Sequence, residues 1–157
     1  MVLIYLIRHA QSEFNATGID SPNVALTQLG TRQAIALGTM FRERGIAFDH
    51  VFVSPLQRAL QTYSLANPIC DHPPIISHAC REQLMGAWAN LMHGENSLVN
   101  VIESTSSLET RAKRFIEYAK MTATPLKHGR IAIFTHQGFI YALTGRMLQN
   151  AEYAVVM

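Results

Sequence analysis

The sequence has few cysteines and no long apolar run. Its two cysteines, Cys70 and Cys80, match neither a CxxC motif nor the spacing of metal ligands, so we expect free thiols and no bound metal. The apolar run at the start, residues 1–7, is too short to span a membrane and lacks the features of a signal peptide. We therefore expect a soluble cytoplasmic protein with no membrane partner.

Charge is also scarce. Charged residues make up 15% of the chain and hydrophobic residues 48%, which excludes a disordered protein. The formal net charge is +2, without any run of lysine or arginine, so we expect no nucleic-acid partner. No internal repeat or low-complexity segment is visible, and 157 residues fit a single domain over 1–157.

The most informative segment that is present lies at the start of the chain. The apolar residues 3–7 end abruptly in Arg8 and His9, which is typical of a buried strand that carries polar residues to the edge of a sheet. Arg8 offers a planar fork for a phosphate or carboxylate. His9 offers a ring nitrogen that can act as base, nucleophile or metal ligand.

Two later strands end in the same way. The apolar residues 51–53 are followed by Ser54, which we expect to cap a helix in a capping box with Gln57. Arg58 then falls in the first turn of that helix, beside unsatisfied backbone amides. The apolar residues 131–134 lead into His136.

The remaining pattern predicts helices between these strands. We expect a helix from a Thr27 cap to about Arg44, a second helix after a capping box of Ser106 and Glu109, and a third after His136. Their predicted apolar faces are Leu29, Leu37, Met40 and Phe41; Leu108, Ala112, Phe115, Ile116 and Ala119; and Phe139, Ile140, Leu143 and Met147. Residues 75–76 and 153–156 read as short strands, and residues 86–105 as irregular or a short helix.

This order predicts an α/β fold, a three-layer sandwich with a mostly parallel central sheet and helices on both faces. In a parallel sheet the carboxyl ends of the strands share one edge, so Arg8, His9, Arg58 and His136 can converge. Two guanidiniums and a helix N-terminus would bind a dianion, and a histidine among them could attack phosphorus. The alternative interpretation of each histidine is a hydrogen-bonded structural residue.

Phosphoryl transfer also needs a proton donor that later serves as a base. Spacing alone does not select one among the acidic candidates, which are Glu13, Asp20, Glu82, Glu95 and Glu103.

Five segments, taken in order, resemble motifs of the histidine phosphatase superfamily, also called the phosphoglycerate mutase-like family. They are Leu6-Ile7-Arg8-His9-Ala10-Gln11-Ser12-Glu13-Phe14-Asn15, Ala25-Leu26-Thr27-Gln28-Leu29-Gly30, Val53-Ser54-Pro55-Leu56-Gln57-Arg58, Glu82-Gln83-Leu84-Met85-Gly86-Ala87-Trp88 and Phe134-Thr135-His136-Gln137-Gly138. Together they extend from residue 3 to about residue 140.

The resemblance implies a role for each site residue. His9 would accept the phosphoryl group, Arg8, Arg58 and His136 would bind it with help from Asn15, and Glu82 would be the proton donor. It also implies that no metal or organic cofactor is needed. The assignment of Glu82 rests on the resemblance alone.

Three departures from the family pattern bear on function. Ala10 replaces the usual glycine after the histidine, where a Cβ would be costly if the backbone needs positive φ. Gln137 stands where a small residue is common, and its amide could touch the substrate. The lid region around residues 86–105 is short, which favours hydrolysis because a mutase must exclude water.

We therefore expect a phosphatase acting on a phosphorylated small molecule or a phosphoprotein. A phosphoglycerate mutase, a phosphohistidine phosphatase and a non-catalytic phosphate-binding module on the same fold are the alternatives. The sequence leaves the oligomeric state open, with a homodimer among the choices.

Overall fold

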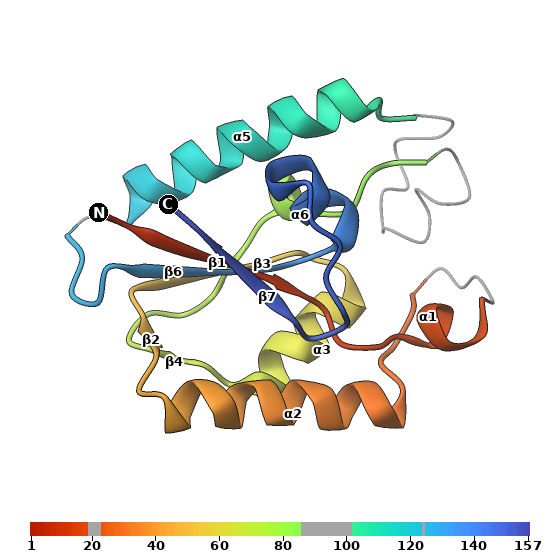
Figure 1. Ribbon diagram of the computed structural model, residues 1–157, viewed down its shortest axis with the longest axis horizontal. Helices are drawn as coiled ribbons and strands as arrows, with labels where there is room; N and C mark the ends of the chain where they lie inside the picture. Colours follow the sequence, from red (N-terminus) through yellow and green to blue (C-terminus); the bar gives the residue numbers. More distant parts are fainter. Residues whose placement is uncertain (19–22, 86–101, 124) are drawn as a thin grey trace.

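A five-stranded sheet forms the middle layer of the protein in the computed structural model, which describes residues 1–18, 23–85, 102–123 and 125–157 (Figure 1). Across the sheet the order is β5 (Ile75–Ile76), β3 (His50–Val53), β6 (Arg130–Thr135), β1 (Leu3–Arg8) and β7 (Tyr153–Val156). The first four strands are parallel, and β7 runs antiparallel to β1. The predicted sheet, including its short strands at residues 75–76 and 153–156, is confirmed.

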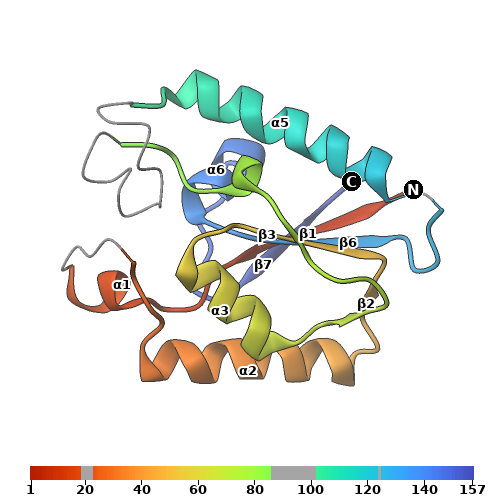
Figure 2. The same cartoon turned by 180° about the vertical axis from the view of Figure 1, so that it is seen from behind.

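Helices cover both faces of this sheet. In the two opposite views, α2 (Gln28–Glu43) and α3 (Gln57–Ala66) lie on one side, and α5 (Thr105–Thr122) and α6 (Gln137–Thr144) on the other (Figures 1 and 2). The smaller elements are α1 (Glu13–Thr17), β2 (Ala47–Phe48), β4 (Ile69–Cys70) and a 3-10 turn, η1 (His78–Cys80). The three-layer α/β sandwich is therefore confirmed. No helix within the described ranges is long and apolar enough to cross a membrane.

The alternation of side chains along each strand divides the core into two parts. Ile4 and Leu6 of β1 face the layer of α5 and α6, whereas Tyr5 and Ile7 face α2 and α3. The strands are apolar on both faces because both faces are covered, as the unbroken run of residues 131–134 indicated. Every member of the face predicted for α5, from Leu108 to Ala119, is buried.

Two predicted helix starts are wrong. Leu56, and not Ser54, is the N-cap of α3, and no side chain caps that helix; the Ser54 hydroxyl instead bonds the ring of His136. At α5 the cap is Ser104, whose hydroxyl accepts from the Ser107 amide, and not Ser106. In each case a nearby hydroxyl residue made the sequence pattern ambiguous.

Two residues of the predicted apolar faces also point to solvent. Leu29 lies in the first turn of α2 and is 44% exposed. Met147 lies beyond the end of α6, because that helix stops before Gly145, which has φ +66°, and the methionine is exposed. The predicted cap of α2, Thr27, is confirmed, since its hydroxyl accepts from the Gly30 amide.

Helices α2 and α3 approach closely at Gly38. A Cβ at this position would overlap the carbonyl of Ala66, which is backbone at the end of α3 and cannot move aside cheaply. We expect Gly38→Ala to lower the free energy of unfolding by about 1–3 kcal/mol, as overpacking does. Urea denaturation measures this, with Thr39→Ala on the exposed side of the same helix as control. Equal midpoints for the two variants would contradict the close packing.

Candidate active site

The two histidines predicted to meet do lie side by side at the carboxyl edge of the sheet. Arg8 of β1 pairs with Thr135 of β6, so the residues that follow, His9 and His136, emerge together. Their ring centroids are 5.2 Å apart, and the His9 amide donates to the Thr135 carbonyl at 3.0 Å. Both residues are buried. The parallel register of two strands thus builds this pair.

The geometry of His9 identifies the tautomer of its ring. Nδ1 lies 2.7 Å from the carbonyl oxygen of Ala10. Because a carbonyl only accepts, Nδ1 must carry the hydrogen, and in the neutral ring the lone pair is then on Nε2. Burial, the largest cause, lowers the pKa of His9 to about 3, and the positive charges of Arg58 and Arg8 also lower it. The hydrogen bond to Ala10 raises the pKa but does not outweigh them. At neutral pH His9 is therefore a neutral imidazole with a free electron pair.

Ala10 fits its position without strain. Among the described residues only Asn67 and Ala151 combine a side chain with positive φ, so the backbone of Ala10 does not require glycine. Its amide donates to Thr62 Oγ1 at 3.0 Å, and the Thr62 hydroxyl donates to the Arg58 carbonyl at 2.7 Å. The buried Thr62 thereby ties the segment after His9 to the first turn of α3, which carries Arg58.

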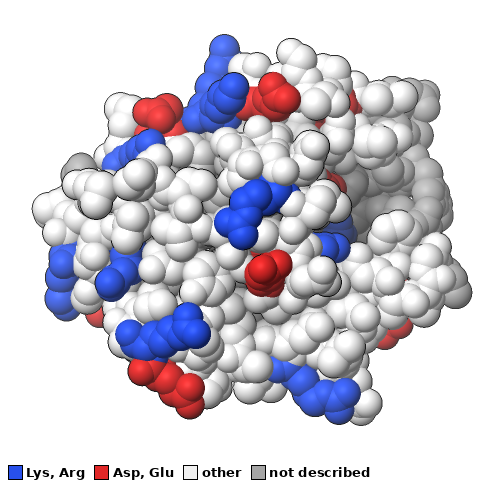
Figure 3. Space-filling model, viewed as in Figure 1, with Lys and Arg blue, Asp and Glu red and all other residues white. Residues whose placement is uncertain are grey.

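Two guanidiniums flank His9. Arg8 donates from Nη1 to the Leu148 carbonyl at 2.6 Å. Burial lowers the pKa of Arg8 and of Arg58, and in both cases the negative charge of Glu82 opposes that shift. The carboxylate of Glu82 is thus near both cations. The space-filling view shows the molecule hollowed at this end, with charged side chains of both signs at the hollow (Figure 3).

Glu82 lies against the N-terminal turn of α6. Its Oε2 accepts from the Gly138 amide at 3.3 Å, and its Oε1 accepts from the Gln83 amide at 3.0 Å. A Cβ at position 138 would overlap Oε1, so glycine is what allows this approach. Among the acidic candidates that lie in the described residues, Glu82 is the one that acts on both Arg8 and Arg58.

The other acidic candidates are placed differently. Glu13 is exposed on α1, and Glu103 forms a bidentate ion pair with Arg111, at 2.8 and 2.9 Å. Asp20 and Glu95 lie outside the described residues, as does most of the predicted lid, residues 86–101. Within the described ranges, no group of three or more His, Cys, Asp or Glu side chains could hold a metal ion.

His136 is held by a contact that the sequence did not predict. Its Nε2 lies 2.7 Å from the hydroxyl of Ser54, which is fully buried at the end of β3. A hydroxyl both donates and accepts, so it can orient the ring in either tautomer. Ser54 was singled out as a helix cap; its position directly after a strand was the signal for a site residue.

The remaining predicted site residues have other contacts. Asn15 forms a capping box with Ser12, and its Oδ1 also accepts from Asn150 at 3.2 Å. Gln137 donates to the Arg146 carbonyl and accepts from the Leu148 amide at 2.9 Å. The Leu148 carbonyl accepts a hydrogen bond from Arg8. By binding the amide of the same residue, Gln137 helps to hold the Arg8 side chain in place. Substrate binding by Asn15 and Gln137 stays a prediction.

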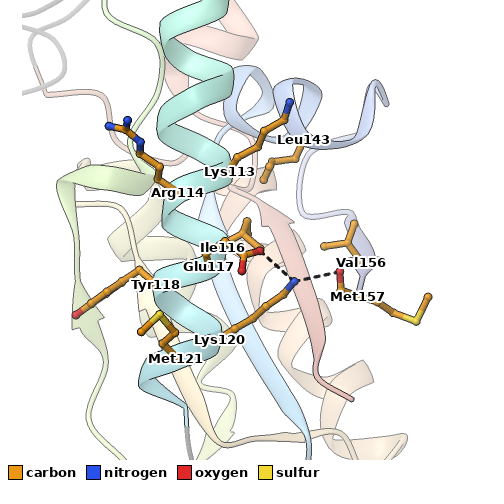
Figure 4. A pocket seen from close by; sticks show the side chains of 10 residues that line it. All are labelled: Lys113, Arg114, Ile116, Glu117, Tyr118, Lys120, Met121, Leu143, Val156 and Met157. Atoms are coloured by element: carbon orange, nitrogen blue, oxygen red, sulfur yellow. Dashed lines mark hydrogen bonds and ion pairs between the residues drawn. The ribbon is translucent and has the colours of Figure 1, made fainter.

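A second, apolar pocket lies away from this site. Its lining includes Tyr118 and Met121 on α5, Leu143 on α6 and Val156 on β7 (Figure 4). Val156 pairs with Ile4 near the start of β1, so this pocket is toward the opposite end of the sheet from His9. None of the predicted site residues lines it.

Comparison with known families agrees with this geometry. The sequence model of the histidine phosphatase superfamily (branch 1) matches residues 4–154. The chain belongs to this superfamily. The resemblance read from the five sequence motifs is thus confirmed.

Individual relatives in this superfamily carry different names. A 2,3-bisphosphoglycerate-dependent phosphoglycerate mutase of Streptococcus equi subsp. zooepidemicus is 43% identical over 73 residues, which cover 45% of this chain and 32% of the relative. The match thus spans about a third of the relative's length.

Solved structures share the fold over the whole chain. A phosphoglycerate mutase of Bacillus anthracis has a TM-score of 0.78 at 16% identity, covering 98% of this chain and 86% of that one. A mycobacterial glucosyl-3-phosphoglycerate phosphatase, solved with VO3, has a TM-score of 0.77 at 18% identity, covering 100% and 93%. Identities this low show the fold alone.

The ionisation of His9 gives the first prediction for this site. Since its pKa lies at about 3, we expect the ring to stay neutral, with hydrogen on Nδ1, from pH 7 down to about pH 4. Nitrogen-15 NMR of the imidazoles measures this directly, and the His9→Asn variant assigns the signal. A midpoint near pH 6.5 for His9 would contradict the burial and the charge arrangement described above.

The same shift has a consequence for stability. A histidine whose folded pKa is depressed takes up protons more readily in the unfolded chain, so its contribution to stability is lost as pH falls from about 6.5 toward 3. His9→Asn should therefore weaken the dependence of the unfolding midpoint on pH in that window. An unchanged dependence would indicate that His9 does not titrate as inferred.

Proposed function

We propose that this protein is a phosphomonoesterase that works through a phosphohistidine on His9. The observation that carries the proposal is the neutral imidazole of His9, with Nδ1 bonded to Ala10, the lone pair on Nε2, and two guanidiniums near enough to act on its pKa. Such an arrangement suits attack on phosphorus, since the cations stabilise the charge of the transferring group.

The first step forms the phosphoenzyme. Nε2 of His9 attacks phosphorus, the bond from phosphorus to the leaving oxygen breaks, and Glu82 gives that oxygen a proton. Arg8, Arg58 and His136 hold the equatorial oxygens. Glu82 is a carboxylate beside both arginines in the free protein, so it receives the proton that it donates from the monoanion of the phosphate that those arginines would bind.

The second step regenerates the enzyme. Glu82, now a carboxylate, takes a proton from water, the water oxygen attacks phosphorus, and the bond from Nε2 to phosphorus breaks. Inorganic phosphate leaves, and His9 is again neutral. This sequence needs no group other than these side chains and water. The substrate class we propose is a phosphorylated small molecule.

A mutase is the second candidate. The curated relative named above is a phosphoglycerate mutase, whereas the structural neighbours named above are one mutase and one phosphatase. We favour hydrolysis because the segment available as a lid is short. A coupled mutase assay with 3-phosphoglycerate and a trace of 2,3-bisphosphoglycerate distinguishes the two. The cytoplasmic location and the absence of a nucleic-acid partner stay predictions.

Replacement of the nucleophile tests the proposal most directly. We expect His9→Asn to lower hydrolysis of p-nitrophenyl phosphate by about 10⁴-fold or more, because the loss of a nucleophile removes the covalent route. Denaturing quench of the wild-type reaction should leave acid-labile phosphate on the protein. His72→Asn, at the other end of the sheet beside His50, is the matched control. Activity of His9→Asn equal to that of the control would refute the mechanism.

The close approach of Glu82 to Gly138 gives a separate test. We expect Gly138→Ala to displace the carboxylate, since a flexible side chain moves before the backbone does. Turnover of an alkyl phosphate should fall by about 10- to 100-fold, a large part of what acid catalysis supplies. The free energy of unfolding should change by less than about 1 kcal/mol. Tyr141→Ala, on the exposed side of α6, is the control.

A further inference from the structure

The segment that carries Glu82 has little regular structure of its own. It runs from η1 to an isolated bridge at Met85, so few backbone ladders hold it. Yet a proton donor must keep its carboxyl within hydrogen-bond reach of the leaving oxygen. Contacts from other elements of the fold must therefore hold this segment.

Four successive carbonyls of the segment are bonded from outside it. Arg111 on α5 donates to the carbonyls of Ala79, Arg81 and Glu82, at 2.7, 3.1 and 3.4 Å. Thr135, the residue before His136, donates its hydroxyl to the Cys80 carbonyl at 2.5 Å. The backbone on the acid's side of the site is thus attached to α5 and to the end of β6.

The guanidinium of Arg111 has no donor left over. Its Nε and Nη2 donate to the two carboxylate oxygens of Glu103, and the same Nη2 also reaches the Glu82 carbonyl. Its Nη1 serves the carbonyls of Ala79 and Arg81. These bonds use all five hydrogens that an arginine offers. Arg111 is therefore not a binding group for phosphate.

Glu103 fixes the other side of the same segment. Its backbone amide donates to the Leu84 carbonyl at 2.8 Å, its Oε2 accepts from the Leu84 amide at 3.3 Å, and its carbonyl accepts from the Gln83 side chain at 2.7 Å. Burial raises the pKa of Glu103, but the bonds and charge of Arg111 outweigh this and leave the pKa below its usual value. The Glu103 side chain is 9% exposed, and its carboxylate remains charged.

We propose that Arg111 and Glu103 are positioning residues that hold Glu82 in place for proton transfer; this rests on the proposed function. Arg111 also lies 5.9 Å from the ring centroid of Phe139 on α6. The adjoining residue of that helix, Gly138, gives its amide to Glu82. The ion pair thus fixes both the backbone of the acid and the helix turn that its carboxylate meets.

The test compares two substrates. An alkyl phosphate needs a protonated leaving group, whereas p-nitrophenolate leaves without one. We expect Arg111→Lys, which keeps the charge but loses the planar fork, to lower kcat/KM by about 10- to 100-fold for the alkyl phosphate and by less than about threefold for p-nitrophenyl phosphate. Glu103→Gln should show the same selective loss. Arg114→Lys, on an exposed position of α5, is the control and should change neither value.

A second readout does not depend on activity. The Gly138 amide is bonded to Glu82, so its hydrogen exchange in the folded protein reports whether the carboxylate is in place. We expect Arg111→Lys to speed this exchange by about tenfold or more, while the exchange of buried β6 amides stays as in the wild type. Both measurements are made below the unfolding transition of each variant.

The outcomes separate the two proposals. If the wild type hydrolyses both substrates and Arg111→Lys lowers kcat/KM for both equally, or for neither, the positioning role is wrong. If the wild type hydrolyses neither, the proposed function is wrong, and the Gly138 exchange alone decides whether Arg111 positions Glu82. Unchanged exchange in Arg111→Lys overturns the inference in either case.

Discussion

The parallel pairing of β1 with β6 is the constraint on which the rest of the site depends. Six residue pairs, from Leu3 with Arg130 to Arg8 with Thr135, fix where both strands end. A slip of one residue would turn the apolar side chains of β1 to the opposite faces, so the covered sheet permits one register. That register sets His9 beside His136. The pairing of β3 with β6 then brings Ser54 to the ring of His136.

Electrostatics and burial act together on His9. Desolvation disfavours the imidazolium form of His9, and the positive charges of Arg58 and Arg8 disfavour it further. His9 is therefore neutral beside two positively charged arginines. Glu82 partly offsets the cost of burying Arg8 and Arg58. Under the proposed function, an incoming phosphate dianion would balance the remaining positive charge of these arginines.

The strands and the meeting of Arg8, His9, Arg58 and His136 could be predicted, because each follows from an apolar run that stops at a polar residue. The acid could not be selected by spacing. Its segment is bonded to Arg111, 29 residues further along, and to Thr135, and no local pattern encodes those bonds. Ser54 was misread because a hydroxyl before a helix usually caps it, whereas here the strand end delivers it to a histidine. The contact of Gln137 with the segment that receives Arg8 could not be predicted either, because it joins residues on two sides of a helix end.

The bridge between Met85 and Ile102 has a consequence for how this protein can change over evolutionary time. The described residues on either side of positions 86–101 are joined by this bridge and by the bonds between Glu103 and Leu84. Doubling the length of chain between two such points costs only about 0.6 kcal/mol in closure entropy. A change in the number of residues between Met85 and Ile102 therefore costs the fold little, while the bonds between Glu103 and Leu84 can stay as they are.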